Sequence, residues 1–338
     1  MKSCKYLIRF LVLPTALLIV SCQTTPLPPG MGDAQCGNIA EKGYINILTI
    51  NLLFSEVDDR NDRLKAVAKF AANNDVDILM LQEVVNGVLV KTDNSAQDLR
   101  DILSKKHNLD YNIQTAFEIG LPGLLAVANA VLSRCEIRYS LVQRLPKTPE
   151  IEFEGLVIEV SRNVLLSRLE IPEFGKINVY NTHLCADCEE FERLEQIDVA
   201  LEFLKKLEEN TGDVYPTILG GDFNFDRFRN DGIQKLQYKR VINTGFIDAY
   251  AEYIIAASAG QETLDTLCED EDSLDQHCTV GVSELNGSKS RRKDYIFARG
   301  FADVLLSEVV FNTLINPEEP TVSDHAGVFV RLGFPFDK

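Results

Sequence analysis

The amino-acid sequence predicts an α/β protein in which two mixed sheets pack together with helices outside. From residue 44 onward, short apolar runs alternate with stretches of helical periodicity, which is typical of βα units. In the middle of the chain several apolar runs follow one another without a helix between them, and this indicates antiparallel pairing. No shift in composition divides the 338 residues, so one layered domain over residues 44–338 accommodates these elements.

The individual elements follow from the local patterns. Strands are expected where short apolar runs end at polar or turn residues. They are residues 44–52, 76–84, 125–134, 156–160, 163–171, 177–184, 217–224, 295–298 and 326–332. Helices are expected over residues 61–74, 96–107 and 189–210. In the last of these, Leu194, Ile197 and Leu201 lie on one stripe at helical spacing, which indicates a face that packs on the core.

The first residues have the features of an export signal. A basic start precedes an apolar run over residues 6–20, which is too short for a membrane-spanning helix. The run ends in Ser21-Cys22 and resembles the bacterial lipobox, in which cleavage precedes a Cys that becomes lipidated. We therefore expect a signal peptide over residues 1–21, and a lipidated Cys22 with a Pro-rich tether over residues 22–43. A plain secretory signal is the alternative.

This leader predicts a bacterial cell-envelope protein that is anchored to the membrane through Cys22. Gln23 stands where retention in the inner membrane usually requires Asp, so the outer membrane is favoured over the inner one. The domain is then expected in the periplasm or at the cell surface, as a monomer.

The net charge of the chain argues against tight binding of long polyanions. The leader holds three basic residues and no acidic ones, so the mature protein has 31 Lys and Arg against 51 Asp and Glu, a formal charge of −20. Proteins that bind nucleic acid tightly usually carry a basic stripe. Here the longest basic run is residues 291–293. Strong nucleic-acid binding is therefore not expected, although a local site can still hold one phosphate.

The cysteines indicate disulfides. An even number remains beyond Cys4 and Cys22, as is common in exported chains. These are Cys36, Cys135, Cys185, Cys188, Cys268 and Cys278. Cys268 and Cys278 bracket an acidic loop that a bridge would close. The C-x-x-C formed by Cys185 and Cys188 is either a tight local bridge or half of a zinc site, and the lack of a second C-x-x-C favours the bridge.

Polar residues stand where the expected strands end, the preferred place for ligand sites in α/β proteins. In "ILGGDFNFD", the alternation of a strand puts Asp222 and Asn224 on one face and Phe223 on the other. The other segments of this kind are "NILTINLLF" with Asn51, "DILMLQEV" with Glu83, "NAVLSR" with Asn129 and Arg134, "NVYNTHL" with His183, "RRKDYIF" with Asp294 and "TVSDHAGVF" with Asp324 and His325. Taken singly, each also fits an ordinary strand-to-loop transition.

In their joint order, these motifs resemble those of the endonuclease/exonuclease/phosphatase superfamily, the DNase I-like fold, over residues 44–332. The resemblance implies a four-layer α/β/β/α sandwich of two packed mixed sheets. It also implies a metal-dependent phosphoesterase that hydrolyses phosphodiester bonds by in-line attack of an activated water. The segment "NTHLCADCEE" resembles, more specifically, bacterial sphingomyelinases and related phosphodiesterases.

The metal ligands implied by this resemblance are oxygen donors. Mg²⁺ keeps several waters and takes one or two protein carboxylates. Glu83, with Asn51 beside it, fits that pattern for Mg²⁺ or Mn²⁺, and Asp324 is expected as a second metal contact. Some family members carry an acid at the place of Leu53, so one metal contact is missing here.

The catalytic roles are assigned by the same chemistry. Asp222 is expected to orient or deprotonate the attacking water, and Asn224 to hold a phosphoryl oxygen. His325, with Asp294 as its carboxylate partner, is expected to act as a general base or as a charged phosphate clamp. His183 would donate to a non-bridging oxygen or to the leaving group. Asn129 and Arg134 are expected to support phosphate binding. Lys293 stands where Ile or Leu is common, which we treat as a minor departure.

Several substrates remain open. The acidic charge, the lipid anchor and "NTHLCA" favour a phospholipid or another small phosphodiester. The alternatives are an endonuclease or exonuclease acting on DNA or RNA, and a phosphatase acting on an inositol phosphate. A hypothesis of another class is a catalytically silent lipoprotein that binds a partner. The complete set of motifs argues against it, because a silent relative would be expected to lose Glu83, Asp222 or His325.

Overall fold

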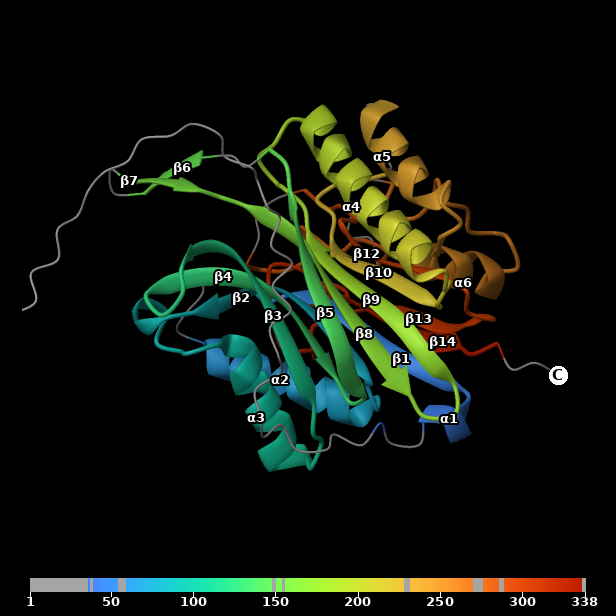
Figure 1. Ribbon diagram of the computed structural model, residues 1–338, viewed down its shortest axis with the longest axis horizontal. Coiled ribbons are helices and arrows are strands. Elements are labelled where there is room, and N and C mark those ends of the chain that lie inside the picture. Colours follow the sequence, from blue (N-terminus) through green and yellow to red (C-terminus); the bar gives the residue numbers. More distant parts are fainter. Residues whose placement is uncertain are drawn as a thin grey trace, which may run out of the picture.

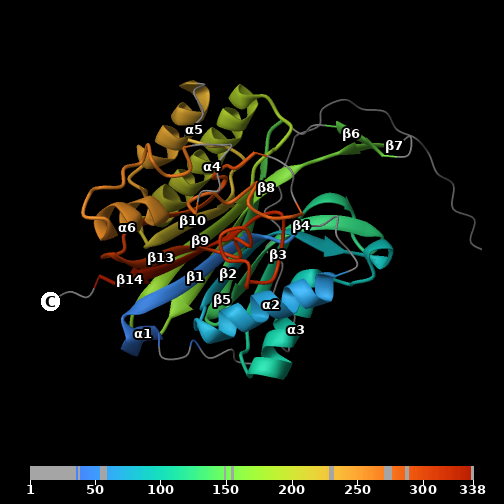
Figure 2. The same ribbon diagram turned by 180° about the vertical axis from the view of Figure 1, so that it is seen from behind.

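Two six-stranded sheets packed face to face form the centre of the molecule in a computed structural model (Figure 1). The structure describes residues 36, 39–53, 59–147, 150–153, 156–227, 232–269, 276–285 and 289–335. Helices cover the outer face of each sheet, α2 and α3 on one side and α4 and α5 on the other (Figures 1 and 2). The predicted four-layer α/β/β/α sandwich is confirmed.

The first sheet combines one parallel strand pair with antiparallel neighbours. In spatial order its strands are β13 (Val304–Val310), β14 (Gly327–Gly333), β1 (Tyr44–Asn51), β2 (Ile78–Asn86), β4 (Leu125–Ser133) and β3 (Asn112–Leu121). The parallel pair is β1 with β2. Helices α2 (Arg60–Asn73) and α3 (Ser95–His107) pack their apolar faces against this sheet.

The second sheet repeats this arrangement with β9 and β10 as its parallel pair. In spatial order its strands are β11 (Ile247–Asp248), β12 (Asp294–Arg299), β10 (Thr217–Asp222), β9 (Gly175–His183), β8 (Arg162–Ile171) and β5 (Glu136–Leu145). Helices α4 (Glu190–Thr211) and α5 (Gly232–Ile242) cover its outer face. The inner faces of both sheets meet in a core of buried aliphatic side chains such as Ile47, Val179 and Ile218.

Smaller elements complete the described chain. Helix α1 (Ile39–Lys42) precedes β1, the short 3₁₀ helix η1 (Val88–Val90) follows β2, and α6 (Ala249–Ala257) follows β11. Strands β6 (Glu150–Phe153) and β7 (Leu156–Glu159) form a separate hairpin before β8. Among the described residues, no helix is long and apolar enough to cross a membrane. The expected signal peptide and Cys22 lie outside the described residues.

Every predicted strand and helix is present, with ends shifted by a few residues. The expected strand over residues 217–224 stops at Asp222, because the chain turns at Asn224, whose φ is 50°. Elements that the sequence did not predict are β3, β5, β6, β11, β13, α1, α5, α6 and the 3₁₀ helix η1.

The remaining cysteines pair as disulfides. Cys185 joins Cys188 and Cys268 joins Cys278. The local bridge expected for the C-x-x-C is therefore the arrangement that the structure shows, rather than half of a zinc site. Cys36 joins Cys135 and ties the segment before β1 to the turn between β4 and β5.

Candidate active site

The candidate site lies where the two parallel strand pairs end. β1 ends at Asn51, β9 at His183 and β10 at Asp222. Because the sheets are packed together, Asn51 Nδ2 of the first sheet reaches Asp222 Oδ2 of the second at 3.3 Å. Asp294 begins β12 directly opposite Asp222 in the ladder. The sandwich thus gathers polar residues from both sheets at one edge.

Two backbone irregularities aim the side chains at this edge. The pairing of β2 with β4 skips residues between Leu81 and Val84, and Glu83 in that bulge has a φ of 54°. Such bulges often redirect a side chain next to an active site. In β10, Gly221 has a φ of 131°, and a Cβ there would lie 1.9 Å from the Thr182 carbonyl oxygen. Glycine therefore allows the close pairing that sets Asp222 beside His183.

Asp222 is the centre of the site. It is almost completely buried. Its Oδ1 accepts the Asn224 N–H at 2.9 Å, and its Oδ2 lies 3.5 Å from His183 Nε2 and 3.7 Å from His325 Nε2. Burial alone would raise the pKa of Asp222, but His325, His183 and Lys293 hold it below its ordinary value. The carboxylate is therefore ionised near neutral pH.

His183 is held in one tautomer by Arg162. Arg162 Nη1 lies 3.0 Å from His183 Nδ1, and a guanidinium can only donate. Nδ1 is therefore the acceptor, and the ring proton is on Nε2, which faces Asp222. Burial and then Arg162 lower the pKa of His183 well below 6.5. The ring is a neutral hydrogen-bond donor.

A buried polar chain supports Arg162 from behind. Glu118 Oε2 lies 3.2 Å from Arg162 Nη1, and Glu118 Oε1 accepts from Asn129 Nδ2 at 2.8 Å. Burial raises the pKa of Glu118 to about 7, although Arg162 lowers it. The structure thus places Asn129 behind His183, in the chain that orients the ring.

Asp294 and His325 form a second buried pair. Asp294 Oδ2 lies 2.9 Å from His325 Nδ1. Burial lowers the pKa of His325, but the adjacent carboxylates of Asp294 and Asp222 outweigh it and raise the pKa to about 10. Burial raises the pKa of Asp294, an effect that His325 opposes. The ring is therefore an imidazolium near neutral pH and brings a positive charge to Asp222.

Oxygen donors for a hard cation are present beside this cluster. Asn51 Nδ2 lies 3.0 Å from Glu83 Oε1, so the carboxamide and the carboxylate are neighbours. A carboxylate with amide oxygens suits Mg²⁺, and a rotated Asn51 amide would present its oxygen. This donor set fits a divalent metal ion.

A second group of possible ligands consists of Asp222, Asp294 and His325, whose ligand atoms lie within 4.8 Å of one another. Because the charged His325 ring already bonds Asp294, we favour Glu83 and Asn51 as the metal ligands. Asp324 lies next to His325, half-buried, where its Oδ1 accepts from Ser323 Oγ at 3.2 Å.

Arg134 lies outside this site. β4 runs antiparallel to β2, so its last residues lie beside the start of β2, at the opposite edge of the sheet. There Arg134 pairs with Asp75 and lies 3.6 Å from Asp77 Oδ1. The role in phosphate binding predicted for Arg134 was wrong, because β4 runs antiparallel to β2 and carries Arg134 to the edge of the sheet opposite the site.

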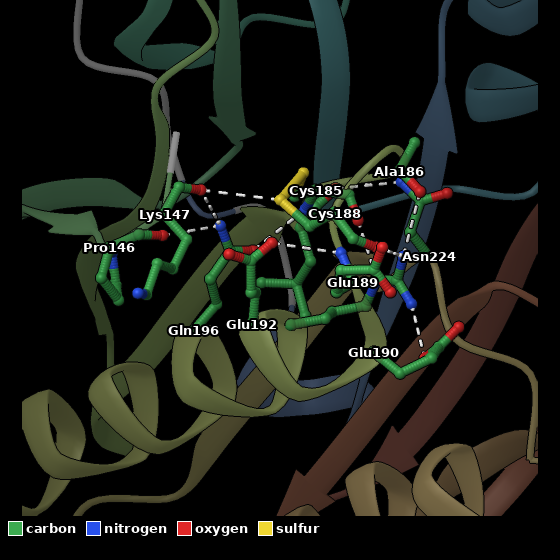
Figure 3. The surroundings of a disulfide bond; sticks show 12 residues. Pro146, Lys147, Cys185, Ala186, Cys188, Glu189, Glu190, Glu192, Gln196 and Asn224 are labelled. Atoms are coloured by element: carbon green, nitrogen blue, oxygen red, sulfur yellow. Dashed lines mark hydrogen bonds and ion pairs between the residues drawn. A yellow bond between two sulfur atoms is a disulfide. The ribbon is translucent and has the colours of Figure 1, made fainter. Parts of the chain in front are cut away.

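The loop after His183 is fixed by the disulfide between Cys185 and Cys188 and by the first turns of α4 (Figure 3). Gln196 Oε1 accepts the Cys185 N–H at 3.0 Å, and Arg193 Nε donates to the Cys185 carbonyl at 2.8 Å. Asn224, which points toward this loop in Figure 3, donates its Nδ2 to the Leu184 carbonyl at 3.0 Å. The loop therefore links α4 to residues 221–224, the GDFN segment.

Three charged residues of the site were not predicted as site residues. Glu118 and Arg162 belong to no motif, so no signal in the sequence marks them. Lys293 was visible as a departure from the family pattern. Its Nζ donates to Asn224 Oδ1 at 3.0 Å.

Comparisons with known proteins agree with this geometry. The model of the "Endonuclease/Exonuclease/phosphatase family" matches residues 48–325. A comparison with curated proteins gives no match.

Solved structures of the same fold cover most of the chain. An endonuclease/exonuclease/phosphatase family protein from Leptotrichia buccalis has a TM-score of 0.60 at 21% identity, over 86% of this chain and 100% of that chain. A mannosyl-6-phosphatase from Bacteroides thetaiotaomicron has a TM-score of 0.60 at 20% identity, over 86% and 100%. Truncated TDP2 from Caenorhabditis elegans has a TM-score of 0.55 at 19% identity, over 86% and 97%. At these identities the likeness shows the fold.

Proposed function

Because this chain belongs to the endonuclease/exonuclease/phosphatase family, whose enzymes hydrolyse phosphoester bonds, we propose that it is a metal-dependent phosphodiesterase for phospholipids or other small diesters. The observation that carries the proposal is the surroundings of Asp222. A buried, ionised carboxylate lies between two histidines of opposite character, one a neutral donor and one a cation. In-line attack on a phosphoryl group needs such a combination of an acceptor for water and donors for oxygen.

In this proposal each side chain has one task. Asp222 accepts a hydrogen bond from the attacking water and orients it, since its lowered pKa makes it a weak base. His183 donates its Nε2 proton to a phosphoryl oxygen, and Arg162 fixes the tautomer. The His325 imidazolium, kept charged by Asp294, attracts the phosphoryl oxygens. These roles require the water and the phosphate to approach Asp222 from the open edge of the sheets.

Mg²⁺ or Mn²⁺ held by Glu83 and Asn51, with Asp324 as the second contact that the family resemblance implies, would neutralise negative charge on the phosphoryl oxygens.

The small-diester preference is supported by charge. Of the basic run at residues 291–293, Arg292 is fully buried and donates to Asp248 Oδ1 at 2.6 Å. It is therefore lost as a contact for a polyanion. A mature charge of −20 repels DNA over a Debye length of roughly 8 Å at physiological salt.

A lipid substrate is supported by an exposed aliphatic tip, formed by Val88 and Leu89 of η1 with Leu121 and Leu124 of the β3–β4 turn. These side chains are 70%, 62%, 66% and 46% exposed. Hydrogen bonds of 3.2 and 3.1 Å join the backbone of η1 to that turn. η1 directly follows β2, the strand that carries Glu83, so the tip lies beyond the catalytic edge (Figure 1). Exposed apolar patches beside a site commonly mark a docking surface.

The experiment that tests the function is a side-by-side assay of the purified protein with Mg²⁺. The substrates are bis-p-nitrophenyl phosphate, sphingomyelin and phosphatidylinositol phosphate vesicles, supercoiled DNA and RNA. We expect turnover of the small diester and of a lipid, little nicking of DNA, and loss of turnover in EDTA. Unchanged turnover in EDTA would exclude the metal mechanism. Robust nicking that is lost in Glu83→Ala would establish the nuclease alternative, and no turnover of any substrate would favour a silent binding protein.

A variant of the tip separates lipid docking from chemistry. Leu89→Asp should lower hydrolysis of lipid in vesicles and leave that of the soluble diester unchanged. Val214→Asp is the matched control, because Val214 is 76% exposed and precedes β10 at the opposite edge. Equal effects of both variants on vesicles would contradict a docking role of the tip.

We also propose that Cys22 anchors the protein to the bacterial envelope. The apolar leader and the Ser21-Cys22 junction support this proposal. The wild-type protein should partition with membranes into detergent, and Cys22→Ala should release it into the soluble fraction. A soluble wild-type protein with an unmodified N-terminus would end this proposal.

A further inference from the structure

Lys293 brings a flexible cation to the site from the residue before β12. Its Nζ donates to Asn224 Oδ1 at 3.0 Å. Its backbone is fixed on both sides, because its N–H donates to Thr279 Oγ1 at 3.0 Å and its carbonyl accepts the Phe223 N–H at 2.9 Å. The root of the side chain therefore has a defined place beside the GDFN segment.

Asn224 determines where the ammonium lies. Its Nδ2 donates to the Leu184 carbonyl at 3.0 Å, so the amide oxygen must face the other way, toward Lys293. Asn224 also donates its N–H to Asp222 Oδ1 at 2.9 Å. The same residue thus contacts the central carboxylate and the ammonium.

The charge of Lys293 also affects the groups at the reacting centre. Burial has the largest effect on the pKa of both Asp222 and His183, and the charge of Lys293 lowers both. The ammonium therefore acts on the two groups that face the expected position of the phosphoryl group. A lysine ammonium has three donors, and Asn224 accepts one of them.

The neighbouring residue shows that this placement is specific. Successive side chains before β12 point to opposite sides. Arg292 points inward, where its guanidinium lies 4.9 Å from the Tyr250 ring centroid and 4.6 Å from that of Tyr295. Lys293 turns to the site instead. Of these two consecutive cations, one is enclosed in the core and the other reaches the catalytic edge.

We propose that Lys293 binds a non-bridging oxygen of the phosphoryl group, and that Asn224 acts as its positioning residue. The proposal rests on the proposed function, since it concerns the same phosphoryl group. It changes the role expected for Asn224, whose amide orients a phosphate-binding lysine. Lys293 then supplies a positive charge that an Ile or Leu at this position would lack.

The test uses inorganic phosphate as the probe, because it reports binding without turnover. Isothermal titration calorimetry with the full chain, in EDTA and in Mg²⁺, should show that Lys293→Met weakens phosphate binding by about 10–100-fold, the loss of one charged hydrogen bond. Lys293→Arg should retain most of the affinity. Lys239→Met, an exposed residue of α5, is the matched control and should bind phosphate like the wild type.

The outcomes separate this inference from the proposed function. Phosphate affinity unchanged in Lys293→Met and in Lys293→Gln, with both variants folded by circular dichroism, would overturn the role of Lys293. If only Met weakens binding, the charge is not the cause and the proposal is likewise wrong. Failure of the wild type to hydrolyse any diester, with the phosphate-binding loss intact, would overturn the proposed function and leave the phosphate contact standing.

Discussion

Asp222→Asn is expected to lower kcat for the small diester by about 10²–10⁴-fold, the usual effect of losing a positioned acid–base or electrostatic group. The substitution removes the ionised acceptor between His183 and His325 while keeping the shape of the side chain. Its effect on stability should be small, because two changes oppose each other. A buried charge disappears, but an amide nitrogen now faces one of the donors that surround the carboxylate.

Single-turnover kinetics and a thermal melt check this prediction. Asp213→Asn is the matched control, because Asp213 is an exposed acid before β10, at the opposite edge of the same sheet. Retained activity in Asp222→Asn would show that another group orients the water. Unfolding of the variant would mean that the residue is structural, and the catalytic assignment would then fail.

Three of the site residues that could be predicted from the sequence share one property. Asn51, His183 and Asp222 each end a buried strand of a parallel pair. The apolar run marks the strand and its polar end marks the edge, so period-two patterning and strand order bring these residues together. Topology explains why the central strands could be predicted. They are buried on both faces, so each gives a continuous apolar run in the sequence.

Edge strands lack that signal. β3, β5, β11 and β13 are the outermost strands of their sheets, and none of the four was predicted. Their residues mix buried, half-buried and exposed positions, as in β5, so no continuous apolar run marks them. The predicted role of Arg134 was wrong for a related reason. A strand's direction in the sheet decides which edge its last residue reaches, and a motif by itself does not contain that direction.

Residues that act behind the site were beyond sequence reasoning. Glu118 lies on β3 and Arg162 on β8, in different sheets. They meet because the sheets pack face to face. Only this packing brings the Glu118 carboxylate to the Arg162 guanidinium, which in turn contacts His183. Lys293 differs from them. The sequence shows that a lysine stands where Ile or Leu is common, but it does not show that the side chain points to the site.

His325→Ala is expected to lower kcat by about 10²–10⁴-fold as well, because it removes the cation that faces Asp222. It should also cost about 1–3 kcal/mol of stability near neutral pH, since the buried Asp294 loses its charged partner. The sign of the pH dependence follows from the raised pKa. His325 has a pKa of about 10 in the folded protein and about 6.5 in the unfolded chain. Its contribution to stability is therefore fully present below the unfolded value and is lost as the pH rises through the folded one.

Urea unfolding between pH 6 and pH 10 separates the catalytic from the structural effect of His325. The difference in unfolding free energy between wild type and His325→Ala should be largest at pH 6 and shrink toward pH 10. His107→Ala, on α3 away from the site, is the control and should show no such trend. Adding Asp294→Asn to His325→Ala should restore stability, because it removes the unpaired carboxylate, while kcat should stay low. Recovery of kcat together with stability would mean that His325 only holds the fold, whereas a difference that is flat with pH would mean that its ring is not charged.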